Sequence, residues 1–240
     1  MFILYEDSDL LIIDKPPGLL TIATEKERER TAYRALMDYV RKGAPKSRNR
    51  VFIVHRLDRE ASGVLVFAKS EPVKRVLQAN WDAVEKKYLA VVHGQLPKKA
   101  DTLSSYLTES KARVVHSTRD KTAGKLSHTA YRVLEQTPAF SLLEITLLTG
   151  RKHQIRVHLA EARHPIVGDQ KYGPADKAHK RLALHALSLS FAHPVSGKTI
   201  KVQTDIPGYL TAVMGQGHQV LARKHPDRPP KLHSFRCGKP

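Results

Sequence analysis

The sequence predicts an α+β fold with a mixed, largely antiparallel central sheet flanked by helices and loops, and three observations lead to this prediction. Short apolar segments typical of strands are interspersed with segments of helical spacing, without regular strand–helix alternation. No repeat of fixed period and no low-complexity tract is present. Hydrophobic residues make up 41% and charged residues 27% of the 240 residues, which is ordinary for a globular protein.

Strands and helices are both predicted in the first 80 residues, in an irregular order. Strands are predicted for residues 2–5, 10–14 and 63–68, with a further short apolar segment at 51–54. Thr31 and Ser70 are each expected to cap a helix, because apolar side chains follow each of them at helical spacing. The Lys-Pro-Pro-Gly sequence at 15–18 predicts a turn, and the basic segment 41–50 predicts a mobile loop.

The rest of the chain continues this irregular order. Strands are predicted for residues 88–92, 130–134, 140–148, 182–186 and 199–203. Residues 154–162 read as a helix, and the basic, poorly periodic segment 104–124 is expected to form loops or a hairpin. We expect one domain over residues 1–215, followed by a basic, Pro-containing tail at 216–240 that is extended or disordered.

The charge balance points to a polyanionic partner. Lys and Arg number 41 against 23 Asp and Glu, a formal net charge of +18. Such a surplus repels itself in a compact protein unless an opposite charge lies against it. Nucleic acid is the favoured partner, because each neutralised phosphate releases counterions. A basic but inert surface and an anionic membrane are the alternatives.

Several protein classes are disfavoured by the sequence. Cys237 is the only cysteine, so neither an intramolecular disulfide nor a thiolate metal cluster is expected, which fits the reducing cytoplasm. The first residues include acids and lack a basic leader, so no signal peptide is expected. No apolar run approaches the roughly 18 residues of a membrane span. Monomer is the default expectation.

One charged loop stands out, because apolar strands flank it on both sides. Residues 54–63 read Val-His-Arg-Leu-Asp-Arg-Glu-Ala-Ser-Gly. An arbitrary charged loop would simply be solvated. Polar side chains held between two buried strands are, however, where a rigid active-site loop is expected.

This loop resembles the His-Arg-Leu-Asp motif of the RluA family of RNA pseudouridine synthases. Other segments are similar to the family's motifs in the same order: residues 9–18, 87–94, 150–159, 164–173, 181–186 and 193–194. Ala61 stands where many members carry Thr, and Lys152 where Thr or Ser is common, which leaves substrate detail open. The chain resembles the compact members, which lack the small N-terminal RNA-binding domain.

The resemblance implies a single pseudouridine synthase catalytic domain, with an active-site cleft across the sheet. The enzyme would flip a uridine out of structured RNA and isomerise it without cofactor or metal. Asp58 would be the essential carboxylate, acting as nucleophile at C1′, as electrostatic partner of the sugar, or as base at C2′; the sequence leaves these roles open. Arg156 would keep Asp58 ionised, since an adjacent guanidinium lowers a carboxyl pKa.

The remaining catalytic and substrate-binding residues also follow from the resemblance. Tyr88 would pack on the uracil and help to remove the C5 proton; a half-buried strand aromatic without a catalytic role is the less favoured alternative. Arg56 would fill the vacancy left by the flipped base or bind phosphate. Leu57 would fix the loop by packing. Further RNA contacts are expected from Lys15, Arg151, His153 and Gln154.

Two other function classes are alternatives to the synthase. A silent RNA-binding protein has no need of a carboxylate amid positive charge. A glycosidase or nucleosidase would want a second carboxylate, for which Glu60 is a candidate. His153 and His158 are five residues apart and lack a zinc motif, so no metal site is expected. The target could lie in ribosomal RNA, transfer RNA or both.

Overall fold

The computed structural model describes residues 1–44, 46–176 and 178–215, which form eleven strands, four α-helices and one short 3₁₀ helix. These residues divide into two compact units. The first unit contains Met1–Val84 and Ser188–Thr204, and the second contains Glu85–Leu187 and residues 205–215. The expected tail at 216–240 and Cys237 lie outside the described residues.

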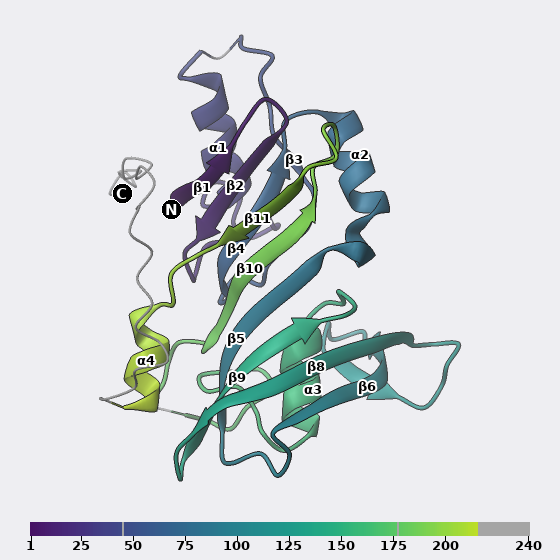
Figure 1. The fold of residues 1–240 in the computed structure, drawn as a ribbon, viewed down its shortest axis with the longest axis vertical. Helices are drawn as coiled ribbons and strands as arrows, with labels where there is room; N and C mark the ends of the chain where they lie inside the picture. The colour runs from purple at the N-terminus through teal and green to yellow at the C-terminus, as the bar shows by residue number, and fades with distance from the viewer. Residues whose placement is uncertain (45, 177, 216–240) are drawn as a thin grey trace. The chain divides into compact units, whose positions relative to one another are not determined.

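The first unit is built around four neighbouring strands. In order these are β1 (Phe2–Glu6), β2 (Leu10–Lys15), β4 (Ser62–Ala68) and β10 (Leu184–Ala192, which begins in the second unit), with β3 (Phe52–Ile53) beside β4 and β11 (Thr199–Gln203) beside β10 (Figure 1). β2 and β4 are antiparallel, and their register places Lys15 opposite Gly63. The turn after β2 therefore lies at the same end of the sheet as the charged loop before β4.

The central strands β2 and β4 are buried on both faces. Leu10 and Ile12 pack in one cluster with Val64, Val66 and Ala68 of β4 and with the second helix. The alternate residues Leu11, Ile13, Leu65 and Phe67 on the opposite face are also fully buried. Side chains of successive strand residues point to opposite faces, so both faces of these strands are covered. Strands held in this way give the turn and the loop at their ends a rigid base.

Both helices of the first unit begin where the sequence predicts. α1 (Ala32–Arg41) is capped by Thr31, whose hydroxyl accepts a hydrogen bond from the Arg34 N–H. α2 (Glu71–Ala79) is capped in the same way by Ser70, which accepts from the Val73 N–H. A hydroxyl at this position satisfies an N–H that has no partner inside the helix. A short 3₁₀ helix, η1 (Trp81–Ala83), follows α2.

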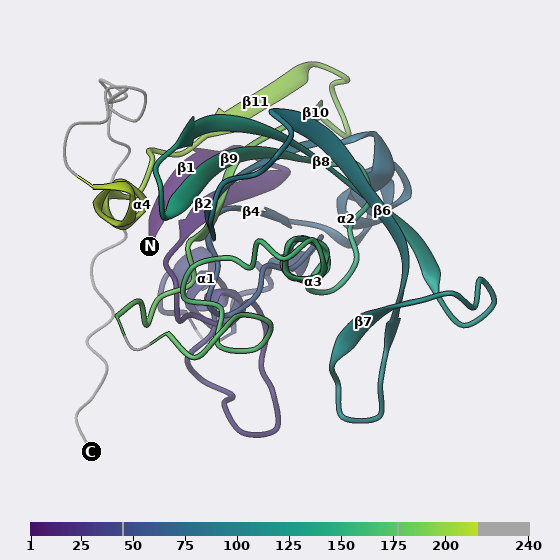
Figure 2. The same cartoon turned by 90° about the horizontal axis from the view of Figure 1, so that it is seen from below.

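The second unit has a curved sheet with one helix in its concavity. The strands lie in the order β5 (Glu85–His93), β9 (Phe140–Leu147), β8 (Lys125–Gln136), β6 (Ala100–Glu109) and β7 (Val115–Thr118). α3 (Gln154–Glu161) contacts β6, β7 and β8 and lies on the concave side of the strands (Figure 2). α4 (Gly208–Met214) contacts β5 and β9. Most of α3 lies in the 150–159 segment that was singled out in the sequence.

The α+β class with predominantly antiparallel pairing is confirmed. The pairs β1–β2, β2–β4, β3–β4, β10–β11, β5–β9, β8–β9, β6–β8 and β6–β7 are all antiparallel. The hairpin expected within residues 104–124 is present as β6–β7. However, β6 begins at Ala100, earlier than the segment expected to depart from the core, and α4 was not expected at all.

A buried histidine predicts that the fold loses stability in mild acid. His185 in β10 is 1% exposed, and burial lowers its pKa to about 3, although a hydrogen bond with the backbone of Asp205 opposes the shift. An unfolded histidine titrates near pH 6.5. Between these two values the unfolded chain binds a proton that the folded chain does not, so the free energy of unfolding falls as pH falls, by up to about 1.4 kcal/mol per pH unit.

Urea unfolding between pH 7 and pH 4.5 measures this effect. The His185→Gln variant should show a shallower pH dependence than the wild type. The remaining slope is expected from His158 and His93, because burial also lowers the pKa of each. Equal slopes in the variant and the wild type would contradict the prediction.

Candidate active site

The charged loop that contains Asp58 connects β3 to β4 in the first unit. Leu57 is buried, Asp58 is half-buried, and Arg56 and Glu60 are exposed. Leu57 thus packs as predicted from the sequence, while Arg56 projects where RNA could reach it. The loop combines a fixed apolar residue with an accessible carboxylate one position later.

The start of this loop is anchored by its histidine. His55 Nε2 accepts a hydrogen bond from the Val66 N–H at 3.1 Å, and the imidazole stacks on Trp81 with ring centroids 4.4 Å apart. The side chain of Gln78 on α2 donates to the Val54 carbonyl at 3.0 Å. These contacts tie the beginning of the loop to β4 and α2, so His55 serves as an anchor in this unit.

The residues on either side of Asp58 are held by the segment that follows β2. The Gly18 N–H donates to the Arg59 carbonyl at 2.8 Å, and Arg59 Nε donates back to the Gly18 carbonyl at 3.2 Å. Gly18 has a φ of +80°, a conformation that favours glycine. On the other side, Thr21 Oγ1 donates to the Leu57 carbonyl at 3.0 Å and accepts from the Leu57 N–H at 3.2 Å.

Lys15 has a different environment from the one that a phosphate contact needs. The residue is fully buried, and its ammonium donates to the carbonyls of Pro16, Leu19 and Arg59 at 2.9 to 3.2 Å. Burial lowers the pKa of Lys15 to about 8, while the charges of Asp58, Glu60 and Asp14 oppose this shift. The ammonium therefore joins the turn to the charged loop that contains Asp58.

In the second unit, Gln154 is also bound within the chain rather than turned toward a ligand. Its Oε1 accepts from the Arg151 N–H and the Thr149 hydroxyl, and its Nε2 donates to the His128 carbonyl and to Thr129 Oγ1. All four distances are 2.9 or 3.0 Å, and the residue is 2% exposed. The amide shapes the turn into α3, a role different from the RNA contact expected from the sequence.

Arg156 on α3 forms a buried two-point ion pair with Asp169. Nε and Nη2 donate to the two carboxylate oxygens at 2.8 and 2.7 Å, and the side chains are 5% and 0% exposed. Burial alone would raise the pKa of Asp169, but hydrogen bonds and charge from Arg156 and the N–H groups of Lys171 and Tyr172 lower it. Asp169 thereby fixes the plane of the guanidinium.

Tyr172 links the same helix to the β6–β7 hairpin. Its hydroxyl accepts from the Val115 N–H at 3.1 Å and lies 2.8 Å from His153 Nδ1. The Arg156 guanidinium carbon lies 5.2 Å from the centre of the tyrosine ring, a cation–π contact. Sequence reasoning did not single out Asp169 or Tyr172, although both lie in a segment that resembles the family.

The other expected site residues of the second unit lie in β5 and at the start of α3. Tyr88 is 8% exposed in β5, paired with Ile145 of β9. His153 is half-buried at the N-terminus of α3, and Arg151 before it is exposed. Tyr88, Arg151, His153, Gln154 and Arg156 therefore belong to the second unit, whereas Lys15, Arg56, Leu57 and Asp58 belong to the first.

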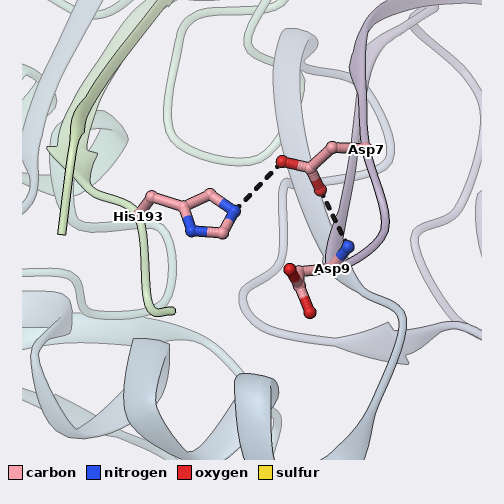
Figure 3. A group of neighbouring side chains, drawn as sticks. All are labelled: Asp7, Asp9 and His193. Carbon is pink, nitrogen blue, oxygen red and sulfur yellow. Dashed lines mark hydrogen bonds and ion pairs between the residues drawn. The ribbon is translucent and has the colours of Figure 1, made fainter. Parts of the chain in front are cut away.

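Among the described residues, one group of side chains has metal-ligand atoms close together: Asp7, Asp9 and His193 (Figure 3). His193 Nδ1 accepts from the Val195 and Ser196 N–H groups, so in the neutral ring the proton is on Nε2, which donates to Asp7 at 3.0 Å. Asp7 also accepts from the Tyr5 hydroxyl and two backbone N–H groups. These bonds make the group a brace between β10 and the β1–β2 turn.

The histidines near α3 are likewise engaged in hydrogen bonds. His158 is 3% exposed, with Nδ1 2.9 Å from Thr129 Oγ1 and Nε2 3.0 Å from Ser105 Oγ. Its pKa is lowered by burial, which favours the neutral ring in this hydroxyl network. Separately, no helix of the described residues is long and apolar enough to cross a membrane.

Comparison with known proteins assigns the family. Residues 9–161 match the family model of RNA pseudouridylate synthases. The chain is 36% identical over 239 residues to ribosomal large subunit pseudouridine synthase D of Xanthomonas campestris, covering 92% of this chain and 70% of that protein. It is 33% identical over 222 residues to the protein of the same name from Zymomonas mobilis, covering 85% and 69%.

A solved structure supports the same fold. Human RNA pseudouridylate synthase domain containing 4 superimposes with a TM-score of 0.71 at 24% identity, over 88% of this chain and 90% of that one. The family model spans both the Asp58 loop and α3, the two segments whose geometry is described above. The chain therefore belongs to the RluA family of RNA pseudouridine synthases and is an isomerase.

Proposed function

We propose that this enzyme converts specific uridines of large-subunit ribosomal RNA to pseudouridine, with Asp58 as the essential carboxylate. The similarity to proteins named ribosomal large subunit pseudouridine synthase D supports ribosomal RNA as the substrate. The observation that carries the role of Asp58 is its setting: a half-buried carboxylate whose neighbours, Leu57 and Arg59, are both held by hydrogen bonds from residues 15–21.

The proposed reaction needs only groups that the chain supplies. The C1′–N1 bond of uridine breaks, the uracil turns, and a C1′–C5 bond forms, so no atom is gained or lost. Positive charge develops on the sugar as the glycosidic bond breaks. Asp58 meets that charge as nucleophile or electrostatic partner, or removes a proton at C2′. Tyr88, on its rigid strand, packs on the uracil and assists the loss of the C5 proton.

Arg156 is proposed to keep Asp58 ionised in the substrate complex. The carboxylate of Asp169 accepts hydrogen bonds from Nε and Nη2 of the Arg156 guanidinium. A guanidinium presents further N–H donors in the same plane, so it can serve a second carboxylate while the first holds it in place. In this arrangement the carboxylate of Asp169 would orient the guanidinium, and the positive charge of the guanidinium would keep Asp58 ionised.

Uridine in a stem or stacked loop must leave its stack to reach Asp58, which costs a few kcal/mol. Arg56, exposed two residues before Asp58, is proposed to occupy the vacated position. Arg151 and His153 at the start of α3 are proposed RNA contacts. Transfer RNA is the alternative substrate, and the cytoplasm, where both RNAs are found, is the proposed location.

An assay with purified full-length protein tests the proposal. The protein is incubated with transcripts of large-subunit ribosomal RNA or transfer RNA, without added cofactor and with a chelator. Pseudouridine positions are then mapped, and free uracil is measured. New pseudouridine in the ribosomal transcript without free uracil is expected. Release of uracil would instead favour hydrolysis with Glu60, and binding without modification would indicate a silent RNA-binding protein.

RNA binding is expected to weaken steeply with salt. The net charge of +18 makes phosphate contacts the main source of affinity. If roughly six phosphates are neutralised, the Kd should rise by about 10³-fold between 50 and 200 mM salt. Titration of a labelled ribosomal RNA fragment at several salt concentrations measures the slope. A Kd that stays constant over this range would contradict an electrostatic interface.

A further inference from the structure

We infer that Thr21 is a positioning residue for Asp58, an inference that rests on the proposed function of that carboxylate. The Thr21 side chain is the group in the described residues that binds both polar atoms of the Leu57 backbone: its hydroxyl donates to the Leu57 carbonyl and accepts from the Leu57 N–H. Thr21 is 3% exposed, so water does not readily replace either bond.

The location of these bonds explains why they act on Asp58. The Leu57 carbonyl lies in the peptide unit that leads into Asp58, and a peptide unit is planar. A hydrogen bond to that carbonyl therefore fixes the plane from which the Asp58 backbone continues. The second bond, from the Leu57 N–H, prevents the peptide before it from rotating. Together they set the direction in which the Asp58 side chain projects.

Thr21 can act in this way because it is itself fixed from the other side. Its carbonyl accepts from the Tyr33 N–H at 3.1 Å, and the neighbouring Leu20 carbonyl accepts from the Ala32 N–H at 2.8 Å. Both donors lie in the first turn of α1, which Thr31 caps. A continuous set of hydrogen bonds thus runs from the start of α1 through Thr21 to the residue before Asp58.

The chemistry of the side chain is specific. The Thr21 backbone carbonyl is committed to α1, so the side chain must provide both a donor and an acceptor for Leu57. A hydroxyl is the smallest side-chain group that does so. Valine has nearly the shape of threonine but neither function, whereas serine keeps the hydroxyl and loses only a methyl group. The pair of substitutions separates hydrogen bonding from packing.

The test compares Thr21→Val with Thr21→Ser under single-turnover and steady-state conditions. Thr21→Val should lower kcat by about 10- to 100-fold, the effect of a reacting group displaced by about 1 Å, with little change in KM or in the Kd for RNA. Thr21→Ser should restore kcat to within a few-fold of the wild type. Thr24→Val, at an exposed threonine three residues later, is the matched control and should leave kcat unchanged.

Several outcomes would overturn the inference. A Thr21→Val kcat equal to that of the wild type, per folded molecule as determined by circular dichroism, would do so. So would equal losses in the valine and serine variants, because these would indicate packing rather than hydrogen bonding. The Asp58→Asn variant is measured in parallel. If it stays active, the proposed role of Asp58 fails; if it is inactive while Thr21→Val is normal, the inference about Thr21 alone fails.

Discussion

Replacing Asp58 with asparagine is expected to abolish pseudouridine formation while RNA binding persists. Asparagine preserves the size of the side chain and leaves the hydrogen bonds of Leu57 and Arg59 in place, since these involve other atoms. It removes the negative charge that each of the three possible roles requires. The rate should fall by at least about 10³-fold, within the range seen when an enzyme loses its catalytic base or nucleophile.

The binding measurement separates this result from simple unfolding. The Kd for ribosomal RNA should remain within a few-fold of the wild-type value, because Asp58 is not among the basic side chains proposed to contact phosphate. Asp38→Asn, on the exposed surface of α1, is a matched control that should keep full activity. Pseudouridine formation by Asp58→Asn at the wild-type rate would show that another group performs the chemistry.

The role of Asp58 can be divided further with labelled substrate. If the carboxylate removes a proton from C2′, uridine carrying deuterium at C2′ should react several-fold more slowly in single turnovers. If it attacks C1′ or stabilises the sugar by charge, the C2′–H bond is not broken in that step and the effect should be small. A large isotope effect would therefore indicate proton removal at C2′, and a small one would indicate attack at C1′ or stabilisation of the sugar by charge.

The sequence predicted the elements whose periodicity is strong and missed those that depend on tertiary packing. The buried strands β2 and β4 and the capped helices α1 and α2 follow from apolar runs and from Thr31 and Ser70. α4 follows Ile-Pro, begins with a glycine, lacks a side-chain cap and spans seven residues. Its burial of Leu210 and Met214 comes from contacts that local sequence does not reveal.

The beginning of β6 was missed for a related reason. Its residues are mostly polar and mostly exposed or half-buried, so they lack the alternation that marks a half-buried strand. The strand exists because β8 pairs with it from Ala100 to Leu107. Backbone pairing with a neighbour can thus maintain a strand whose side chains give little indication of it.

The structure shows the surroundings of the predicted site residues, which the sequence could not. Resemblance to a family could identify the Asp58 loop and α3, yet Lys15 and Gln154 were expected to contact RNA and instead bind the chain itself. The type of a basic or amide residue does not reveal whether its side chain is buried in the protein or exposed to solvent. Only the fold reveals that carbonyls surround the Lys15 ammonium.

The same limit applies to Asp169, whose buried contact with Arg156 the sequence did not reveal. Replacing Asp169 with alanine should lower the free energy of unfolding by about 3–5 kcal/mol, the usual cost of leaving one buried charge without its partner. Arg156 is 5% exposed and Asp169 is 0% exposed, so water cannot take the place of the carboxylate. The loss should appear as a lower urea midpoint.

A surface ion pair of similar length provides the control. Lys98 and Asp101 are also 2.8 Å apart, but their side chains are 66% and 36% exposed. Asp101→Ala should therefore lower the free energy of unfolding far less than Asp169→Ala, since water solvates the lysine that remains. If Asp169→Ala and Asp101→Ala cost the same, the Arg156–Asp169 pair does not contribute as a buried interaction.

A double substitution then distinguishes the pair's contribution to stability from its contribution to the site. Arg156→Met combined with Asp169→Leu removes both charges and should recover part of the lost unfolding free energy, because no unpaired charge stays buried. Pseudouridine formation should be lost in this double variant, since the guanidinium proposed to hold Asp58 ionised is gone. A stable protein that has lost pseudouridine formation would locate the requirement in the charge of Arg156 rather than in the integrity of the fold.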